Sequence, residues 1–229
     1  VDETIAILAD GRTVARKGNI GKPVPLDATT RVVEINDLGA LEAALAAGDV
    51  AACLFEPALT NIGIVLPEPG YHESVRALCT KYGALLVIDE THTISAGPGG
   101  CTMAWGLDPD FVTIGKTLGA GIASGAYGMT ERVRAMILQH TDAKNADVGG
   151  IGGTLAGNAL SLAAMHATLG EVMTDAAFER MIELGEHFEE GVGGVIESRE
   201  LPWHVVRLGC RVEYLFRADR ARNGAEAAA

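Results

Sequence analysis

The sequence predicts an α/β protein with a mostly parallel sheet, and two observations support this fold class. Short apolar runs alternate with stretches of helical periodicity along the chain. Two of these runs, 51–55 and 84–88, are apolar throughout, as expected for strands that are buried on both faces of a parallel sheet. The length of 229 residues fits one large domain or one and a half ordinary ones.

Residues 1–30 are predicted to be irregular, because glycine and proline interrupt them repeatedly. Leu38, Leu41 and Leu45 recur at helical spacing, and Asn36 or Asp37 precedes them as a helix cap. The elements expected up to residue 90 are a strand over 31–35, this helix, a strand over 51–55, a helix over 71–82 and a strand over 84–88.

The second half of the chain continues the alternation after a long glycine- and threonine-rich loop over 91–110. In the helix predicted over 177–192, Phe178, Met181 and Phe188 fall on one side, which indicates an amphipathic helix. The elements expected here are strands over 111–114 and 124–129, a helix through 133–137, helices over 158–174 and 177–192, and strands over 203–208 and 211–216.

Composition excludes several classes of function. The 18 basic and 30 acidic residues leave a net charge of −12, which argues against a nucleic-acid partner or an anionic membrane surface. No apolar run reaches the ~20 residues of a membrane span. The four cysteines form no C-x-x-C pair and the histidines no H-E-x-x-H motif, so neither a metal site nor a disulfide framework is expected. A reducing cytoplasm is the expected location.

Charged residues follow three of the predicted strands, at the edge where α/β sheets bind ligands: Glu56, Asp89 and Lys116. A magnesium-binding carboxylate of a nucleotide hydrolase would require a G-x-x-x-x-G-K-[ST] loop, but Asp110 stands at its first glycine position. The pair Asp89 and Lys116 suits a carbonyl cofactor instead, with a lysine to bond the carbonyl carbon and a carboxylate to keep a ring nitrogen protonated.

Five ordered motifs resemble the class III pyridoxal-phosphate aminotransferases of fold type I, notably the branch similar to glutamate-1-semialdehyde aminomutase. The motifs are E-P-x-x-x-N-x-G at 56–63, PEPGY at 67–71, GALLVIDE at 83–90, LDPDFVTIGK at 107–116 and GTLAGN at 153–158. The resemblance implies a three-layer large domain of the PLP-transferase fold, over 1–170 of this chain. Residues 171–229 would begin an α+β C-terminal small domain.

The resemblance also implies roles for individual residues. Lys116 would form the Schiff base with pyridoxal 5'-phosphate and move a proton, and Asp89 would pair with the pyridinium nitrogen. Thr91 would pack on the ring, and Asn61 would lie near the phenolic oxygen. Thr154 would reach the phosphate of the neighbouring subunit's cofactor, which implies a homodimer with shared active sites.

Glu56 and His92 are also expected at the cofactor, and neither of them nor Glu90 has a defined role. Glu56 resembles a supporting carboxylate, as does Glu90, which follows Asp89 directly. His92 stands where the mutase branch has an apolar residue, and we expect it to line the site entrance. Family members are nearly twice as long, so the chain is expected to be an internal segment, and the isolated segment is expected to be inactive.

Three functions remain open on the sequence. The first is an aminotransferase that moves an amino group between an amino acid or amine and a keto acid. The second is an aminomutase of the glutamate-1-semialdehyde type, which shifts the amino group within one substrate. The third is a non-catalytic fragment or homologue, suggested by the lack of an upstream glycine- and serine-rich segment to hold the phosphate.

Overall fold

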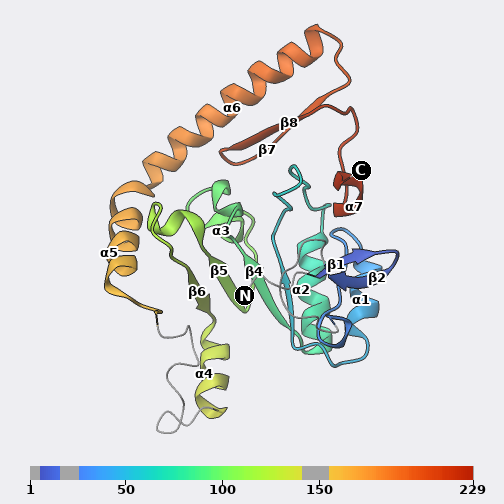
Figure 1. Cartoon of the computed structure of the whole chain (residues 1–229), viewed down its shortest axis with the longest axis vertical. Coiled ribbons are helices and arrows are strands. Elements are labelled where there is room, and N and C mark those ends of the chain that lie inside the picture. The colour runs from blue at the N-terminus through green and yellow to red at the C-terminus, as the bar shows by residue number, and fades with distance from the viewer. Residues whose placement is uncertain (1–5, 16–25, 141–154, 229) are drawn as a thin grey trace.

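The computed structural model describes residues 6–15, 26–140 and 155–228 (Figure 1). Its centre is a four-stranded sheet in the order β3-β4-β5-β6. The strands are β3 (Ala52–Phe55), β4 (Leu85–Asp89), β5 (Phe111–Ile114) and β6 (Ala126–Met129). The first three are parallel and β6 is antiparallel to β5, which confirms the predicted α/β class with a mostly parallel sheet.

The strand register brings the ends of β4 and β5 to one edge of the sheet. Asp89, the last residue of β4, lies opposite Thr113 near the end of β5. The backbone N–H of Glu90 donates to the carbonyl of Thr113 at 2.8 Å, which extends the pairing one residue beyond β4. The segments that follow the two strands therefore leave the sheet side by side.

Two helices, α1 (Leu38–Leu45) and α2 (Tyr71–Tyr82), bury their apolar sides against one face of the sheet. Asp37 begins α1 by accepting a hydrogen bond from the backbone of Ala40 at 2.8 Å, as one of the two predicted caps. Helix α2 has the predicted bounds and ends at Gly83 in the left-handed conformation. The shared core contains Leu41, Leu45, Val75, Cys79 and Leu86.

The rest of the main body consists of short helices around the sheet. The predicted loop after β4 contains a 3-10 turn (Thr93–Ala96) and helix α3 (Gly100–Ala104), and helix α4 (Glu131–His140) follows β6. The helix predicted over 158–174 is α5 (Ala159–Ala167) followed by a π-helical turn (Thr168–Val172). Asn158 caps α5 through the backbone of Ser161 at 3.0 Å.

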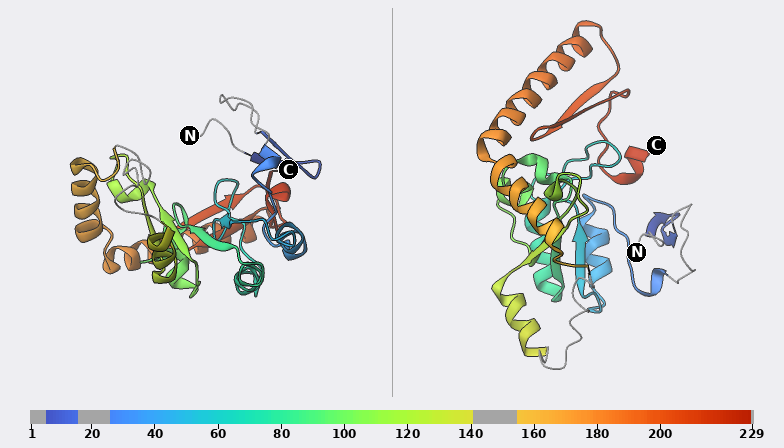
Figure 2. Two further views of the ribbon diagram at one scale, coloured as in Figure 1. Left: turned by 90° about the horizontal axis from the view of Figure 1, so that it is seen from below. Right: turned by 60° about the vertical axis from the view of Figure 1, so that its left-hand side comes forward.

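Helix α6 (Asp175–Ser198) and the hairpin of β7 (His204–Leu208) and β8 (Arg211–Leu215) project beyond one end of the sheet (Figure 2). The hairpin turn packs closely on the 3-10 turn, where Cys210 N donates to the carbonyl of Ser95 at 2.9 Å. A Cβ on Gly209 would lie 2.0 Å from that carbonyl oxygen, so only glycine permits this approach. Helix α7 (Gly224–Ala228) ends the described chain.

Two predictions for the first 35 residues are wrong. Strands β1 (Ala6–Ala9) and β2 (Arg12–Ala15) form a hairpin inside the segment expected to be irregular. Both residues of its turn, Asp10 and Gly11, have positive φ. An Asp-Gly pair favours this conformation and is a strong sequence signal for a hairpin. Residues 31–35 form no strand, because this segment pairs with no strand of the described chain.

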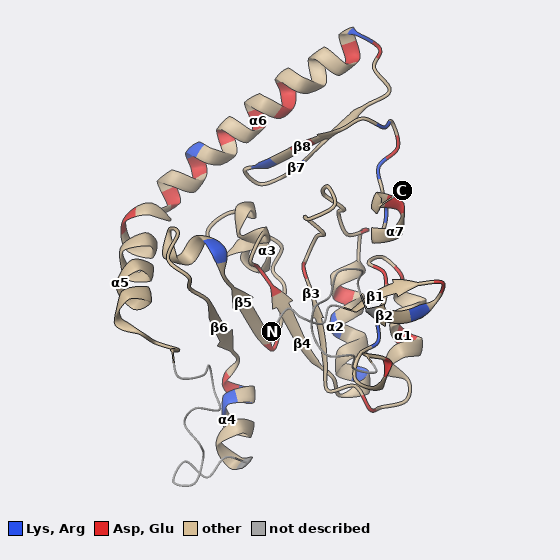
Figure 3. Ribbon diagram, viewed as in Figure 1, with Lys and Arg blue, Asp and Glu red and all other residues tan. Residues whose placement is uncertain are grey.

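Acidic side chains recur along α6, the longest helix described (Figure 3). Among the helices of the described ranges, none combines the length and the apolar character that crossing a membrane requires.

Asp110 anchors the edge of the sheet opposite to Asp89. Its carboxylate is buried and accepts hydrogen bonds from Leu86 N and Arg76 at 2.9 Å each, and from Arg132 at the start of α4. Burial acts to raise the pKa of Asp110, but the Leu86 N–H and the two guanidinium groups stabilise the carboxylate and hold its pKa below the usual value.

We expect Asp110→Asn to lower the free energy of unfolding at pH 7 by about 2 kcal/mol, because the two arginines lose their charged partner. The folded-state pKa of Asp110 is depressed, so its contribution is present above the unfolded-state pKa of about 3.9 and is lost as pH falls through the folded-state value. Urea unfolding should show the difference between variant and parent at pH 7 and its disappearance at acidic pH. Asp108→Asn, at an exposed neighbour, is the control; an equal effect there would contradict the prediction.

Candidate active site

Asp89 lies at the carboxyl end of β4 with one carboxylate oxygen engaged. Its Oδ1 accepts a hydrogen bond from the backbone N–H of Thr91 at 2.9 Å, which closes an Asx turn. The other oxygen, Oδ2, has no hydrogen-bond partner in the described part of the chain. The turn therefore fixes the orientation of the carboxylate and leaves one oxygen able to accept a ligand's proton.

Lys116 lies just beyond the end of β5, the strand next to Asp89. Its backbone has a φ of 47°, a left-handed conformation that costs a non-glycine residue about 1 kcal/mol. The side chain is exposed and forms no ion pair with the described residues. Thr91 packs on the preceding residue, since a Cβ on Gly115 would lie 3.6 Å from Thr91 Oγ1. The structure thus brings Asp89, Thr91 and Lys116 to the same edge.

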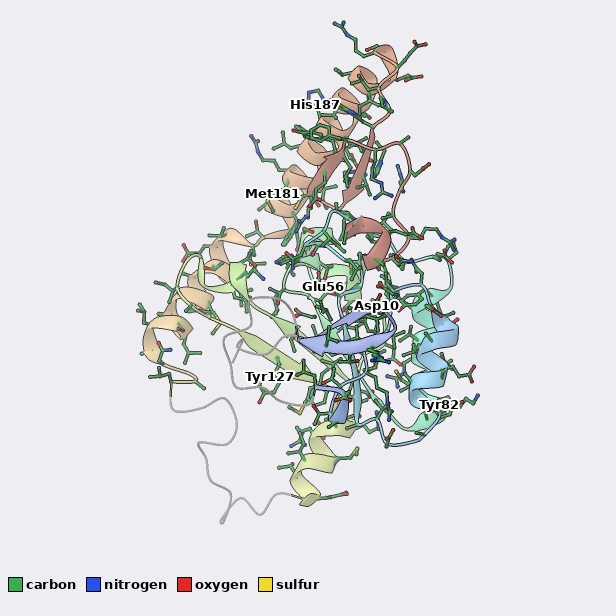
Figure 4. All side chains as sticks on the ribbon, turned by 45° about the vertical axis from the view of Figure 1, so that its right-hand side comes forward. Asp10, Glu56, Tyr82, Tyr127, Met181 and His187 are labelled. Atoms are coloured by element: carbon green, nitrogen blue, oxygen red, sulfur yellow. The ribbon has the colours of Figure 1, made fainter. Side chains whose placement is uncertain are left out.

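Glu56 and His92 are joined by a residue that the sequence did not suggest. Thr60 is buried, and its hydroxyl donates to Glu56 Oε2 at 2.6 Å and lies 2.8 Å from His92 Nδ1. This chain of hydrogen bonds links the loop after β3 to the turn after β4. In Figure 4, Glu56 lies near the centre of the molecule, between the sheet and the C-terminal hairpin.

The C-terminal hairpin reaches the same loop. Arg211, on β8, donates to the backbone carbonyl of Thr60 at 2.5 Å, and Glu213 Oε1 holds the same guanidinium at 2.5 Å and 2.8 Å. Next to them, a Cβ on Gly63 would lie 3.1 Å from Leu215, so the loop passes directly over β8. No local pattern could reveal this contact, because Thr60 and Arg211 are 151 positions apart.

Glu90 has a structural place rather than a place at the cofactor edge. Its side chain is buried and accepts hydrogen bonds from Thr93 Oγ1, Thr102 Oγ1 and the backbone N–H groups of Cys101 and Thr102, at 2.5 to 3.1 Å. The carboxylate therefore satisfies the first turn of α3. Burial and the nearby Glu90 charge both raise the pKa of the Cys101 thiol.

Two predicted cofactor residues take no part in these contacts. Asn61 follows Thr60 directly, but its side chain is exposed and forms no hydrogen bond with the described residues. Thr154 lies outside the described residues.

A comparison with models of known protein families identifies the family of this chain. The model of the family described as aminotransferase class-III matches residues 19–215. The chain belongs to the class III aminotransferases. Pyridoxal phosphate is the cofactor of this family.

Three individual proteins show how similar this chain is to proteins of known name or structure. The chain is 37% identical to the glutamate-1-semialdehyde 2,1-aminomutase of Sorangium cellulosum, over 94% of this chain and 48% of that protein. A crystal structure of a glutamate-1-semialdehyde aminomutase from Pseudomonas aeruginosa PAO1 in complex with PMP matches with a TM-score of 0.92 and 47% identity, over 99% of this chain and 51% of that one. A β-phenylalanine aminotransferase from Variovorax paradoxus matches with a TM-score of 0.75 and 26% identity, over 85% and 45%.

These matches confirm the resemblance and the fold, and they show that the chain spans about half the length of its relatives. The described residues fit pyridoxal phosphate. The engaged Asp89 with its open Oδ2 suits a protonated ring nitrogen, and the exposed Lys116 amine on the neighbouring strand suits a carbonyl carbon.

We expect Gly100→Ala to destabilise the fold by about 3 kcal/mol or more. A Cβ there would lie 2.3 Å from Glu90 Oε2, in addition to the strain of a side chain at φ +64°. Gly106→Ala is a matched control, since Gly106 has φ +63° and open space around it, and should cost only about 1 kcal/mol. Denaturant unfolding of both variants measures the difference, and equal losses would contradict the assigned role of Glu90.

Proposed function

We propose that this chain is the central part of a pyridoxal-phosphate-dependent aminotransferase that moves an amino group between an amino acid or amine and a keto acid. The observation that carries the proposal is the meeting of Asp89 and Lys116 on adjacent strand ends in a class III chain. Asp89 Oδ2 and the Lys116 amine form no hydrogen bond or ion pair with the described residues, so both groups are available to a ligand.

The proposal assigns each residue a task. Bound pyridoxal phosphate supplies an electron-withdrawing ring that stabilises negative charge on the substrate carbon. Asp89 Oδ2 would accept the ring N–H, and the Asx turn through Thr91 keeps that oxygen in place. Lys116 Nζ would hold the cofactor covalently and carry a proton to and from the substrate carbon.

The remaining predicted residues would complete the cofactor site. Thr91 would pack against the ring, since its side chain already lies beside Gly115. Asn61 would approach the phenolic oxygen, and Thr154 the phosphate of a neighbouring subunit. Glu56 and His92 would flank the site through Thr60.

We also propose a homodimer with shared sites and a domain boundary near residue 170. Helix α5, which follows the Thr154 segment, exposes large apolar side chains, among them Leu160 at 64% and Leu162 at 50%. A second subunit is a suitable cover for such a surface.

The domain boundary near residue 170 is supported by the π-helical turn, where the chain leaves α5 and starts the longer α6.

An aminomutase is the second candidate, favoured by the 47% identity to the Pseudomonas protein named as one. The two reactions use the same residues and differ in whether a separate amino acceptor is needed. We expect the full-length protein to convert β-phenylalanine only with added 2-oxoglutarate if it is a transaminase. If the protein converts glutamate 1-semialdehyde completely without an added amino acceptor, it is a mutase. Chromatography of the products measures this conversion.

We expect Lys116→Ala in the full-length protein to abolish turnover and the visible absorption of the lysine-bound cofactor, because no other described amine follows β5. Lys81→Ala is the control, since Lys81 lies on α2 and pairs with Glu42 at 2.6 Å. Borohydride reduction and peptide mapping should place the adduct on Lys116 only. A Lys116→Ala protein that keeps both absorption and turnover would contradict the role of Lys116, whereas a parent protein with neither would support the non-catalytic alternative.

A further inference from the structure

The hydrogen bonds at Thr60 determine where His92 carries its proton. A threonine hydroxyl has one proton to donate and two lone pairs to accept with. Thr60 donates that proton to the carboxylate of Glu56 at 2.6 Å. The contact of 2.8 Å to His92 Nδ1 must then be a bond in which Nδ1–H donates to the hydroxyl oxygen.

This assignment leaves His92 Nε2 as the ring nitrogen with a free lone pair in the neutral side chain. No hydrogen bond to Nε2 is formed by the residues that the structure describes. The same logic applies at metal sites and catalytic histidines, where a partner on one ring nitrogen sets the tautomer and the other nitrogen does the binding.

His92 lies between two segments that end at the candidate cofactor edge. His92 follows Thr91, whose side chain packs beside the residue before Lys116. On the other side, Thr60 directly precedes Asn61 in the loop after β3. The imidazole is half-buried where these two loops meet.

We propose that Glu56, Thr60 and His92 form a hydrogen-bonded relay that presents His92 Nε2 as an acceptor to a hydrogen-bond donor in the cofactor-loaded site. Thr60 and Glu56 are positioning residues, which act through His92. The inference rests on the proposed function and adds to it a polar contact at a position where the mutase-like branch is expected to have an apolar residue.

Arg211 stabilises the backbone of Thr60 in this relay. Its guanidinium holds the Thr60 carbonyl while Glu213 holds the guanidinium, so the threonine is fixed at its backbone as well as its hydroxyl. The buried threonine is therefore held at its backbone by Arg211 and at its hydroxyl by Glu56 and His92.

If the bond between His92 and Thr60 served only to link the two loops, substitutions of His92 would affect stability and not the function of Nε2. The amide nitrogen of asparagine can replace Nδ1–H as the donor to Thr60, but asparagine offers nothing at the Nε2 position. Glutamine reaches the Nε2 position but does not supply the donor at Nδ1. The two variants therefore separate the link to Thr60 from the function of Nε2.

We expect His92→Asn in the full-length protein to keep the thermal midpoint and cofactor absorption of the parent, and to lose about tenfold or more in kcat/KM with β-phenylalanine or glutamate 1-semialdehyde. His92→Gln should lower the thermal midpoint. His187→Asn, on the exposed part of α6 (Figure 4), is the control and should match the parent. A His92→Asn protein with parental kcat/KM would overturn the role of Nε2.

Nitrogen-15 NMR of histidine-labelled full-length protein tests the relay without turnover. The His92 signals, assigned by their loss in His92→Asn, should show a protonated Nδ1 and an unprotonated Nε2. Thr60→Ser should keep this tautomer and Thr60→Val should lose it. On addition of pyridoxal phosphate, the Nε2 signal should move while the His187 signals stay.

The outcomes distinguish the two proposals. A protonated Nε2 in the neutral imidazole of the parent, or an Nε2 signal that ignores bound cofactor, would overturn the inference whether or not the enzyme is active. Failure to bind pyridoxal phosphate at all would overturn the proposed function, while the Nδ1–H tautomer would still establish the relay in the protein itself.

Discussion

The buried carboxylate of Glu90 is the constraint on which the site depends. Four donors from the turn after β4 and the start of α3 converge on it, and the charge would be costly if any of them were withdrawn. Because these donors come from residues 93–102, the chain after β4 has to fold back on itself at once. That return fixes the turn in which Asp89, Thr91 and His92 lie, so the buried Glu90 determines the geometry of the proposed cofactor residues.

A second buried carboxylate serves the opposite edge of the sheet. Asp110 joins the first residues of β4 to α2 and α4 through Leu86, Arg76 and Arg132. The two carboxylates hold opposite ends of the same pair of strands, and both are fully engaged. The groups left open at the carboxyl edge, Asp89 Oδ2 and the Lys116 amine, are therefore not needed for folding in the described chain. Both groups are available to a ligand, and the left-handed conformation of Lys116 is of the kind that clusters at ligand sites.

Local chemistry made much of this predictable from sequence. The bounds of α2, the Asp37 cap and the placing of Asp89 and Lys116 at strand ends follow from periodicity, capping residues and strand polarity. The failures have physical reasons too. Residues 31–35 were apolar enough for a strand, but a strand needs a partner, which no local pattern supplies. The sequence does not distinguish the role of Glu90 from that of Asp89, because the donors that bind Glu90 lie in the turn after β4 and in α3. The sequence does not indicate the contacts of Thr60 either, because His92 and Arg211 lie 32 and 151 positions away.

The long-range contacts change how the C-terminal hairpin should be regarded. If a domain boundary near residue 170 separated independent units, the hairpin would touch the main body only lightly. Instead Gly209 sits against the Ser95 carbonyl, and Val206 and Leu208 share a buried cluster with Ala58 and Cys101. Arg211 then reaches the backbone of Thr60, the residue that orients His92. The hairpin therefore packs on the loops that carry Thr60 and His92, and a shift of β8 relative to the sheet would reach Thr60 through its backbone carbonyl.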